Sequence, residues 1–241
     1  MYKKEKAKIE FIARFKNLTD IEEIRPQPAH KFIPEWWKTS PWDIETNLSH
    51  RPEGHLVKQC PMFPDFFSSG YILPMWADTI IYFNENSKEW LWKCGSTQSP
   101  FKIDIFQNEQ FLKNQEYKMH GLSASAIFQF HNPWQIKTTS KYYIFQLPLF
   151  YHFNNNFSVL PGTYDASVAL TNKLEVAYFG NAKEIFIKKG TPLAQYIPYK
   201  KEKINYIIRE LNQNDINENE KGIIKRATMF KNFYAKNKYK G

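Results

Sequence analysis

The chain has 241 residues, of which 42% are hydrophobic and 17% aromatic, with 20 Phe, 14 Tyr and 7 Trp. This is enough bulky apolar material for a sizeable core, so the composition excludes an intrinsically disordered protein. Of the formal net charge of +9, the stretch from Pro198 onward carries 11 Lys and Arg against 5 Asp and Glu, a net of +6, which leaves about +3 for the rest. The charge pattern therefore describes a basic tail on a nearly neutral domain.

The two cysteines, Cys60 and Cys94, lack the paired spacing of a structural zinc site. The charged start, Met1–Lys6, is not followed by the apolar stretch of a signal peptide, and no run approaches the ~20 apolar residues of a membrane helix. We expect a soluble protein with no membrane partner, in the cytoplasm, or in the host cytoplasm or virion if a phage encodes it. The frequent Lys, Asn, Ile, Phe and Tyr are typical of AT-rich genomes, as in many phages.

Short strands are predicted along the first half of the chain. Polar and apolar residues alternate over 9–15, and the run 71–83 predicts a strand pair interrupted at Pro74. The turn formers of 84–87 join this run to a strand at 89–93, which predicts a β-hairpin. Three tryptophans in seven residues, at 36, 37 and 42, favour a hydrophobic plug over a binding platform.

Alternating apolar residues with Gly and Pro at the corners predict about six more short strands between 124 and 198. We therefore predict a mainly β fold, an antiparallel β-sandwich or barrel that is dUTPase-like or jelly-roll-like. It forms a single β domain over 1–199. No parallel sheet and no helix is expected over 140–198.

After Pro198 the hydrophobic period changes to that of a helix. Two amphipathic helices are predicted, joined by 212–219, and together they make residues 200–241 a basic helical appendage packed on the β domain. The apolar residues at helical spacing are Ile204, Ile207, Ile208 and Leu211 in the first helix, and Ile223, Ala227, Phe230 and Tyr234 in the second.

Residues 131–199 resemble the second half of the dUTPase and dCTP deaminase fold. Gly162-Thr163-Tyr164-Asp165 stands in place of that family's Gly-Asp turn, and Lys189–Gln195 in place of its final Lys-Gly-Asp-Arg-Ile-Ala-Gln strand. The resemblance implies that Asp165 orients a nucleophilic water. The family's phosphate-binding Pro-Arg-Ser element would fall at 146–150, where neither Arg nor Ser is present. We therefore expect the fold without dUTPase activity.

The whole chain is also similar to an uncharacterised family of phage and bacterial proteins, which implies no activity. The shared motifs are Ile-Pro-Glu-Trp-Trp at 33–37, Gly-Tyr-Ile-Leu-Pro at 70–74, His-Asn-Pro-Trp at 131–134 and Gly-Thr-Pro-Leu-Ala-Gln at 190–195.

Each candidate ligand-binding or catalytic residue has a structural alternative. Asp165 is either catalytic or bonds its own backbone in a tight turn. Tyr164 either stacks on a ligand ring or packs. His131 and Asn132 either form a site or an Asn-Pro corner, and Gln195 is either a ligand contact or part of a strand re-entering the core.

Two further kinds of site are considered. His120, His131 and His152 would have to converge in space to hold a metal, because no His-x-His pair places two ligands on one strand face. Lys225, Arg226, Lys231 and Lys236 in the tail are interleaved with aromatic residues, a pattern that single-stranded nucleic-acid binding and ordinary basic helices share.

The sequence therefore leaves three functions open. The first is a ligand-binding, accessory or structural protein; the second is a nucleotide-processing enzyme that uses Asp165; the third is a metal-dependent jelly-roll enzyme that uses histidines. The partner is a small molecule or nucleotide, or nucleic acid bound through the basic tail. The sequence identifies no cofactor and no oligomeric state, and it leaves open whether the chain is an enzyme.

Overall fold

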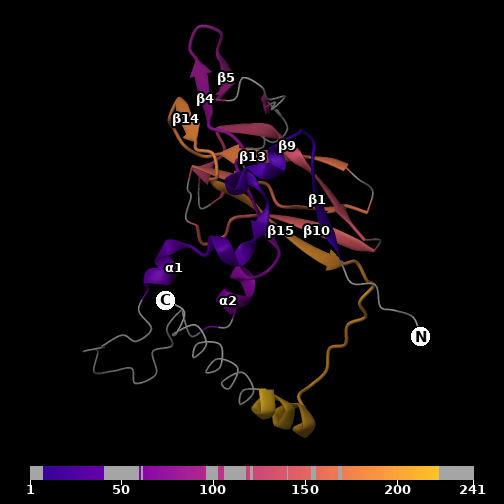
Figure 1. Ribbon diagram of the computed structural model, residues 1–241. Helices are drawn as coiled ribbons and strands as arrows, with labels where there is room; N and C mark the ends of the chain where they lie inside the picture. Colours follow the sequence, from indigo (N-terminus) through magenta and orange to yellow (C-terminus); the bar gives the residue numbers. More distant parts are fainter. Residues whose placement is uncertain are drawn as a thin grey trace.

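Figure 1 shows a computed structural model of the chain, in which a β-rich body carries a long C-terminal extension. The structure describes residues 8–40, 60, 62–95, 103–105, 118–119, 122–139, 141–152, 156–167 and 170–222. In these residues antiparallel strands dominate, which confirms the prediction of a mainly β, antiparallel fold. Each sheet has free edges in the described part of the chain, so none of them closes into a barrel.

The first sheet is built around the long strand β9. It has the order β1-β9-β13-β11, and β6 pairs with β9 on the same side as β1. The even-numbered residues of β9 face the core, as the period of two in a strand requires. The strands of this sheet are β1 (Ile9–Ala13), β6 (Ile103–Ile105), β9 (Ala126–Thr138), β11 (Phe157–Val159) and β13 (Leu170–Tyr178).

The second sheet has the order β12-β10-β15-β3-β2. Its central strand β15 pairs with β10 on one side, from Tyr142↔Lys200 to Pro148↔Ala194, and with β3 on the other. The strands are β2 (Gln27–Pro28), β3 (Tyr71–Pro74), β10 (Tyr142–Pro148), β12 (Gly162–Asp165) and β15 (Pro192–Lys200).

A third sheet, β14-β4-β5, contains the predicted hairpin. The Asn84 side-chain oxygen accepts hydrogen bonds from the backbone N–H groups of Asn86 at 2.9 Å and Ser87 at 3.3 Å, and this Asx turn closes the hairpin. The hairpin prediction is confirmed. The strands are β4 (Thr79–Asn84), β5 (Glu89–Cys94) and β14 (Glu184–Ile187), and a separate pair is formed by β7 (Lys118–Met119) and β8 (Leu122–Ser123).

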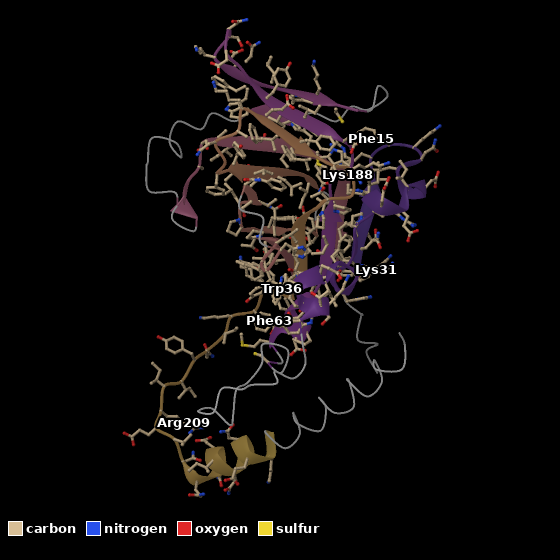
Figure 2. All side chains as sticks on the ribbon, turned by 90° about the vertical axis from the view of Figure 1, so that its left-hand side faces the viewer. Phe15, Lys31, Trp36, Phe63, Lys188 and Arg209 are labelled. Atoms are coloured by element: carbon tan, nitrogen blue, oxygen red, sulfur yellow. The ribbon has the colours of Figure 1, made fainter. Side chains whose placement is uncertain are left out.

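Short helices cover one end of the body and hold the tryptophan plug. Trp37 is buried and stacks on Phe63 with ring centroids 5.2 Å apart, while the Trp36 indole donates to the Tyr151 carbonyl oxygen at 2.5 Å. Figure 2 shows Trp36 and Phe63 together at the lower end of the body. Packing is confirmed for these two tryptophans, and Trp42 lies outside the described residues. The helices are η1 (Leu18–Asp20), η2 (Glu22–Ile24), η3 (Ala29–Phe32), α1 (Glu35–Thr39) and α2 (Met62–Phe67).

One hydrophobic cluster takes side chains from all three sheets, so a single core supports the body. Its largest fully buried side chains are Trp134, Tyr178, Tyr196, Phe128 and Phe130. In the described part of the chain, no helix is long and apolar enough to cross a membrane.

The predicted helix over 204–211 is wrong. Residues 201–212 have no regular secondary structure, and a helix begins instead at 213 and is described through 222, where a linker was expected. The apolar side chains of this segment do not pack on the β body: Ile204 is 83% and Ile208 is 89% exposed. Helical spacing alone does not form a helix when no surface receives the apolar stripe. The second predicted helix, from Ile223, lies outside the described residues, and the domain boundary at 199 stays a prediction.

Candidate functional site

Three aromatic side chains form a cluster on the outer surface of the second sheet, which we call the aromatic face: Tyr143 and Phe145 on β10, and Tyr199 on β15. The rings of Phe145 and Tyr199 stack with centroids 4.3 Å apart and 30° between their planes, and those of Tyr143 and Tyr199 lie 5.9 Å apart. Phe145 is 41% exposed, although it sits beside the fully buried Ile144. The alternation of the strand therefore turns an aromatic surface outward.

Polar groups border the aromatic face on two sides. The Thr163 hydroxyl on the edge strand β12 lies 2.6 Å from the Tyr199 hydroxyl. The Lys201 ammonium lies 4.7 Å from the centre of the Tyr143 ring, within cation–π range. Rings, a cation and hydroxyl groups are thus gathered on one sheet surface.

Asp165 also borders this face, at the end of β12 opposite Tyr143. Its carboxylate accepts a hydrogen bond from the Ser167 backbone N–H at 2.9 Å, which is the turn geometry expected from the structural alternative. Hydrogen bonds from the Ser167 side chain and backbone and from Tyr143, together with the positive charge of Lys201, hold the pKa of Asp165 below its usual value. A lowered pKa keeps the carboxylate ionised and makes it a weaker base.

Two other predicted contacts have structural roles. Tyr164 pairs with the buried Ile144 and packs against the main core, on the side of β12 opposite Asp165. Gln195 is 3% exposed, and its amide donates to the carbonyl oxygens of Phe66 at 3.2 Å and Ser69 at 2.7 Å. Gln195 therefore fastens the end of α2 to β15, and the structure does not bring it to the aromatic face.

The interpretation of His131 and Asn132 as a corner is wrong, because both lie inside β9. The strand continues through Pro133, whose carbonyl oxygen accepts a hydrogen bond from the N–H of Arg14, the residue after β1. The partner strand β13 has a bulge between Thr171 and Lys173 opposite this point. His131 is half-buried and stands opposite Lys173.

Asn132 is fully buried between Phe130 and Trp134 on the core side of β9. Its side-chain oxygen accepts from the Trp134 backbone N–H at 2.9 Å, whereas its Nδ2 group has no hydrogen-bond partner, alone among the buried side-chain polar atoms of the described chain. The Asn132 side-chain amide therefore has its acceptor satisfied by Trp134, while its NH₂ donor is buried without an acceptor.

The predicted metal ligands do not meet in the described part of the chain. His131 lies in the first sheet, and His152 lies in the turn after β10, where burial lowers the pKa of its imidazole. His120 lies outside the described residues. Within the described ranges, no group of three or more His, Cys, Asp or Glu side chains is placed to hold a metal ion.

The four cationic residues predicted to bind polyanions all lie outside the described residues: Lys225, Arg226, Lys231 and Lys236.

Sequence reasoning missed the aromatic face, although a signal was present. In the run 142–148 the odd positions carry Tyr143, Phe145 and Leu147, so an aromatic set alternates with the buried Ile144 and Gln146. The alternation does not predict whether the odd or the even positions of this run face solvent, because both contain large apolar residues.

In comparisons with known proteins, no protein-family model and no curated protein matches the chain.

Proposed function

We propose that this protein is a binding module and that its ligand is single-stranded nucleic acid held on the aromatic face. The observation that carries the proposal is the stack of the partly exposed Phe145 ring on Tyr199. The Lys201 ammonium lies over the neighbouring Tyr143 ring, on the same face. Bases of any sequence stack on exposed aromatic rings, and lysines beside them bind the phosphates. Lys200, Lys201 and Lys203 follow the aromatic face directly in the chain, and the basic tail continues this charge.

The test is fluorescence anisotropy with a labelled single-stranded oligonucleotide and its duplex, across a salt series of about 50–200 mM. We expect the single strand to bind more tightly than the duplex, because paired bases present no ring face. Phe145→Ala is expected to weaken binding about 5- to 150-fold, the range for loss of one stacked base. Phe150→Ala is the matched control, since Phe150 is 48% exposed but lies outside the aromatic face.

Two further variants separate the contributions of charge. Lys201→Ala should lower the steepness of the plot of log Kobs against log[salt] by about one, the value for one phosphate contact. Truncation after Asn219 measures what the tail adds. If the wild type binds no single strand at about 50 mM salt, or if Phe145→Ala binds as well as Phe150→Ala, the proposal is wrong.

A second candidate function is nucleotide processing with Asp165 positioning a water molecule. What favours it is the ionised carboxylate beside a surface where a base ring would stack. A panel of deoxynucleoside triphosphates assayed for pyrophosphate release tests it, with Asp165→Asn as the comparison. Turnover that Asp165→Asn abolishes would replace the binding proposal with an enzyme, and no turnover on any substrate would remove this candidate.

We also propose that the two five-stranded sheets pack face to face as a β-sandwich. One core cluster that includes side chains from both sheets supports this arrangement. The jelly-roll-like and dUTPase-like descriptions, like the resemblance to the phage and bacterial family, stay predictions.

A further inference from the structure

The segment 201–211, which we call the arm, exposes more apolar surface than any comparable stretch of the described chain. It leaves the end of β15 and runs away from the body, and Arg209 lies far out along it (Figure 2). Its five large apolar side chains are 73–89% exposed: Ile204, Tyr206, Ile207, Ile208 and Leu211. Contiguous apolar surface of this kind marks an interaction site.

The arm has the properties of a strand without a partner. Within the described chain, no backbone N–H of residues 202–211 donates a hydrogen bond. Its two ends are anchored: the Lys201 N–H donates to the Lys141 carbonyl oxygen, and Arg209 pairs with Asp215 in the helix that follows. That helix begins with reciprocal bonds between Asn212 and Asp215, a capping box. The exposed segment is thus a defined element between two ordered ends.

The arm does not return to the body from which it comes. Lys200-Lys201-Glu202-Lys203 contains no Gly, Pro, Asn or Asp to make a turn, so the chain continues outward. At about 3.3 Å per residue, the extended chain from 201 to 208 spans roughly 23 Å. Within the described chain, the apolar side chains of the arm are therefore left uncovered.

A matching receptor lies on strand β14, towards the other end of the body (Figure 1). In the described chain β14 pairs only with β4, so its second edge is open. Phe186 on this strand is 59% exposed and borders a hollow of about 190 Å³, which Tyr178, Ala182 and Ile185 also line. Glu184 at the rim of the hollow has no cationic partner among the described residues.

We propose that the arm of one copy adds to the open edge of β14 in a second copy. Backbone groups of the arm then complete the edge. Because side chains alternate along a strand, Lys203 and Ile207 lie on the face of Glu184 and Phe186, and Ile204, Tyr206 and Ile208 lie on the face of Ile185, over the hollow. Tyr206 contributes about 150 Å² of buried surface, and the four aliphatic side chains contribute roughly 60–120 Å² each. The arm side therefore offers roughly 400–600 Å² of apolar surface, which is a large share of the ~800 Å² per partner of a standard interface.

The contact is heterologous, because the arm and the receptor are different surfaces, at different ends of the body. Such contacts add copies head to tail until a ring closes or a filament grows. Assembly therefore continues beyond a dimer when both surfaces are intact. When one surface is mutated in each of two variants, their mixture stops at a dimer, and this difference tests the proposal.

The experiment measures the mass of the full chain by sedimentation velocity from about 1 to 100 µM. The arm variant is Ile204→Asn/Ile207→Asn/Ile208→Asn, and the receptor variant is Phe186→Ser/Glu184→Lys. All five positions are exposed, so both variants should keep the circular dichroism of the wild type. Phe150→Ser, which alters an exposed aromatic residue away from β14, is the control.

We expect the wild type and Phe150→Ser to grow beyond two copies with concentration, and each of the two surface variants to remain a monomer. An equimolar mixture of the two variants should form a complex of two copies and nothing larger, because it contains one working arm and one working receptor. Lys203→Glu should weaken wild-type assembly at least tenfold, and Lys203→Glu/Glu184→Lys should restore it.

The inference is overturned if the wild type stays monomeric over this range, since the arm would then serve a different protein. It is also overturned if either surface variant assembles like the wild type, or if the mixture remains monomeric. Phe145→Ala, the variant that tests nucleic-acid binding, should leave assembly unchanged, so this inference and the proposed function fail independently.

Discussion

Strand β15 and the arm that follows it contain the same kinds of residue and have opposite surroundings. Leu193 and Tyr196 in β15 are 2% and 0% exposed, whereas Tyr206 and Ile207 in the arm are 84% and 85% exposed. β15 has β10 on one side and β3 on the other, and the arm has no neighbouring strand in the described chain. β propensity is the same in both, so strand partners and a core decide which segment is buried.

The largest expected difference between β15 and the arm is the loss of unfolding free energy when one tyrosine in each is replaced by alanine. Tyr196→Ala is expected to lower the free energy of unfolding by about 3–5 kcal/mol, because it leaves a large cavity in the core. It also removes the hydroxyl that donates to the Gln146 side-chain oxygen at 3.4 Å. Tyr206→Ala should change that free energy by less than about 0.5 kcal/mol. Urea unfolding followed by circular dichroism measures both, and equal losses would mean that the arm is packed in the folded monomer.

A second comparison uses glycines. Gly70 has φ +72°, and a Cβ at this position would lie 2.1 Å from the Tyr196 carbonyl oxygen of β15. Gly70→Ala should therefore cost about 3 kcal/mol, the upper end for a strained residue, because a clash is added to the unfavourable φ. A Cβ at Gly222, in the helix beyond the arm, meets nothing within 4 Å. Gly222→Ala should leave the urea midpoint of the β body unchanged, and a matching loss in both variants would contradict the comparison.

A smaller effect is expected for buried glutamine. Gln195→Leu removes the donor for two carbonyl oxygens, those of Phe66 and Ser69, and should cost about 2 kcal/mol. Gln213→Leu, in the helix beyond the arm, is the control and should cost less than about 0.5 kcal/mol. Thermal melting of the two variants decides whether Gln195 is structural. A melting temperature equal to that of the wild type would show that α2 does not depend on this link.

The smallest effect concerns pH. The folded-state pKa of Asp165 lies below its usual value because of Ser167, Tyr143 and Lys201. Its ionised form therefore adds stability above pH 3.8, the ordinary pKa of an aspartate, and this stability is lost as the pH falls through the folded-state pKa. Between about pH 6 and pH 2.5 the urea midpoint of the wild type should fall more steeply than that of Asp165→Asn.

Asp215→Asn is the matched control for this pH series. The pKa of Asp215 is also lowered, by its hydrogen bonds with Arg209 and the Asn212 backbone, but these contacts lie at the outer end of the arm and not in the β body. Asp215→Asn should therefore leave the pH dependence of the urea midpoint of the β body as in the wild type. A flattened profile in Asp215→Asn would show that the arm and the body unfold together.

Much of the fold was predictable because its signals are local. The hairpin at 79–94 follows from Asn84 and its neighbours, whose side-chain bonds to the backbone make the turn without help from distant residues. The turn at Asp165 follows in the same way, through its bond to Ser167. The aromatic face was harder to predict, because both sides of β10 contain large apolar residues.

Residues within a few positions of one another specify the strands, the turns and the basic, apolar character of the C-terminal stretch, so these features can be predicted from the sequence. Contacts between distant segments place Asn132 inside β9, bring Gln195 to the end of α2, and leave 204–211 neither helical nor buried. Those outcomes depend on which surface is available to pair with or cover each segment. The apolar spacing of 204–211 fits a helix and also a strand, and the free energy of burial selects between them only when a partner surface is present.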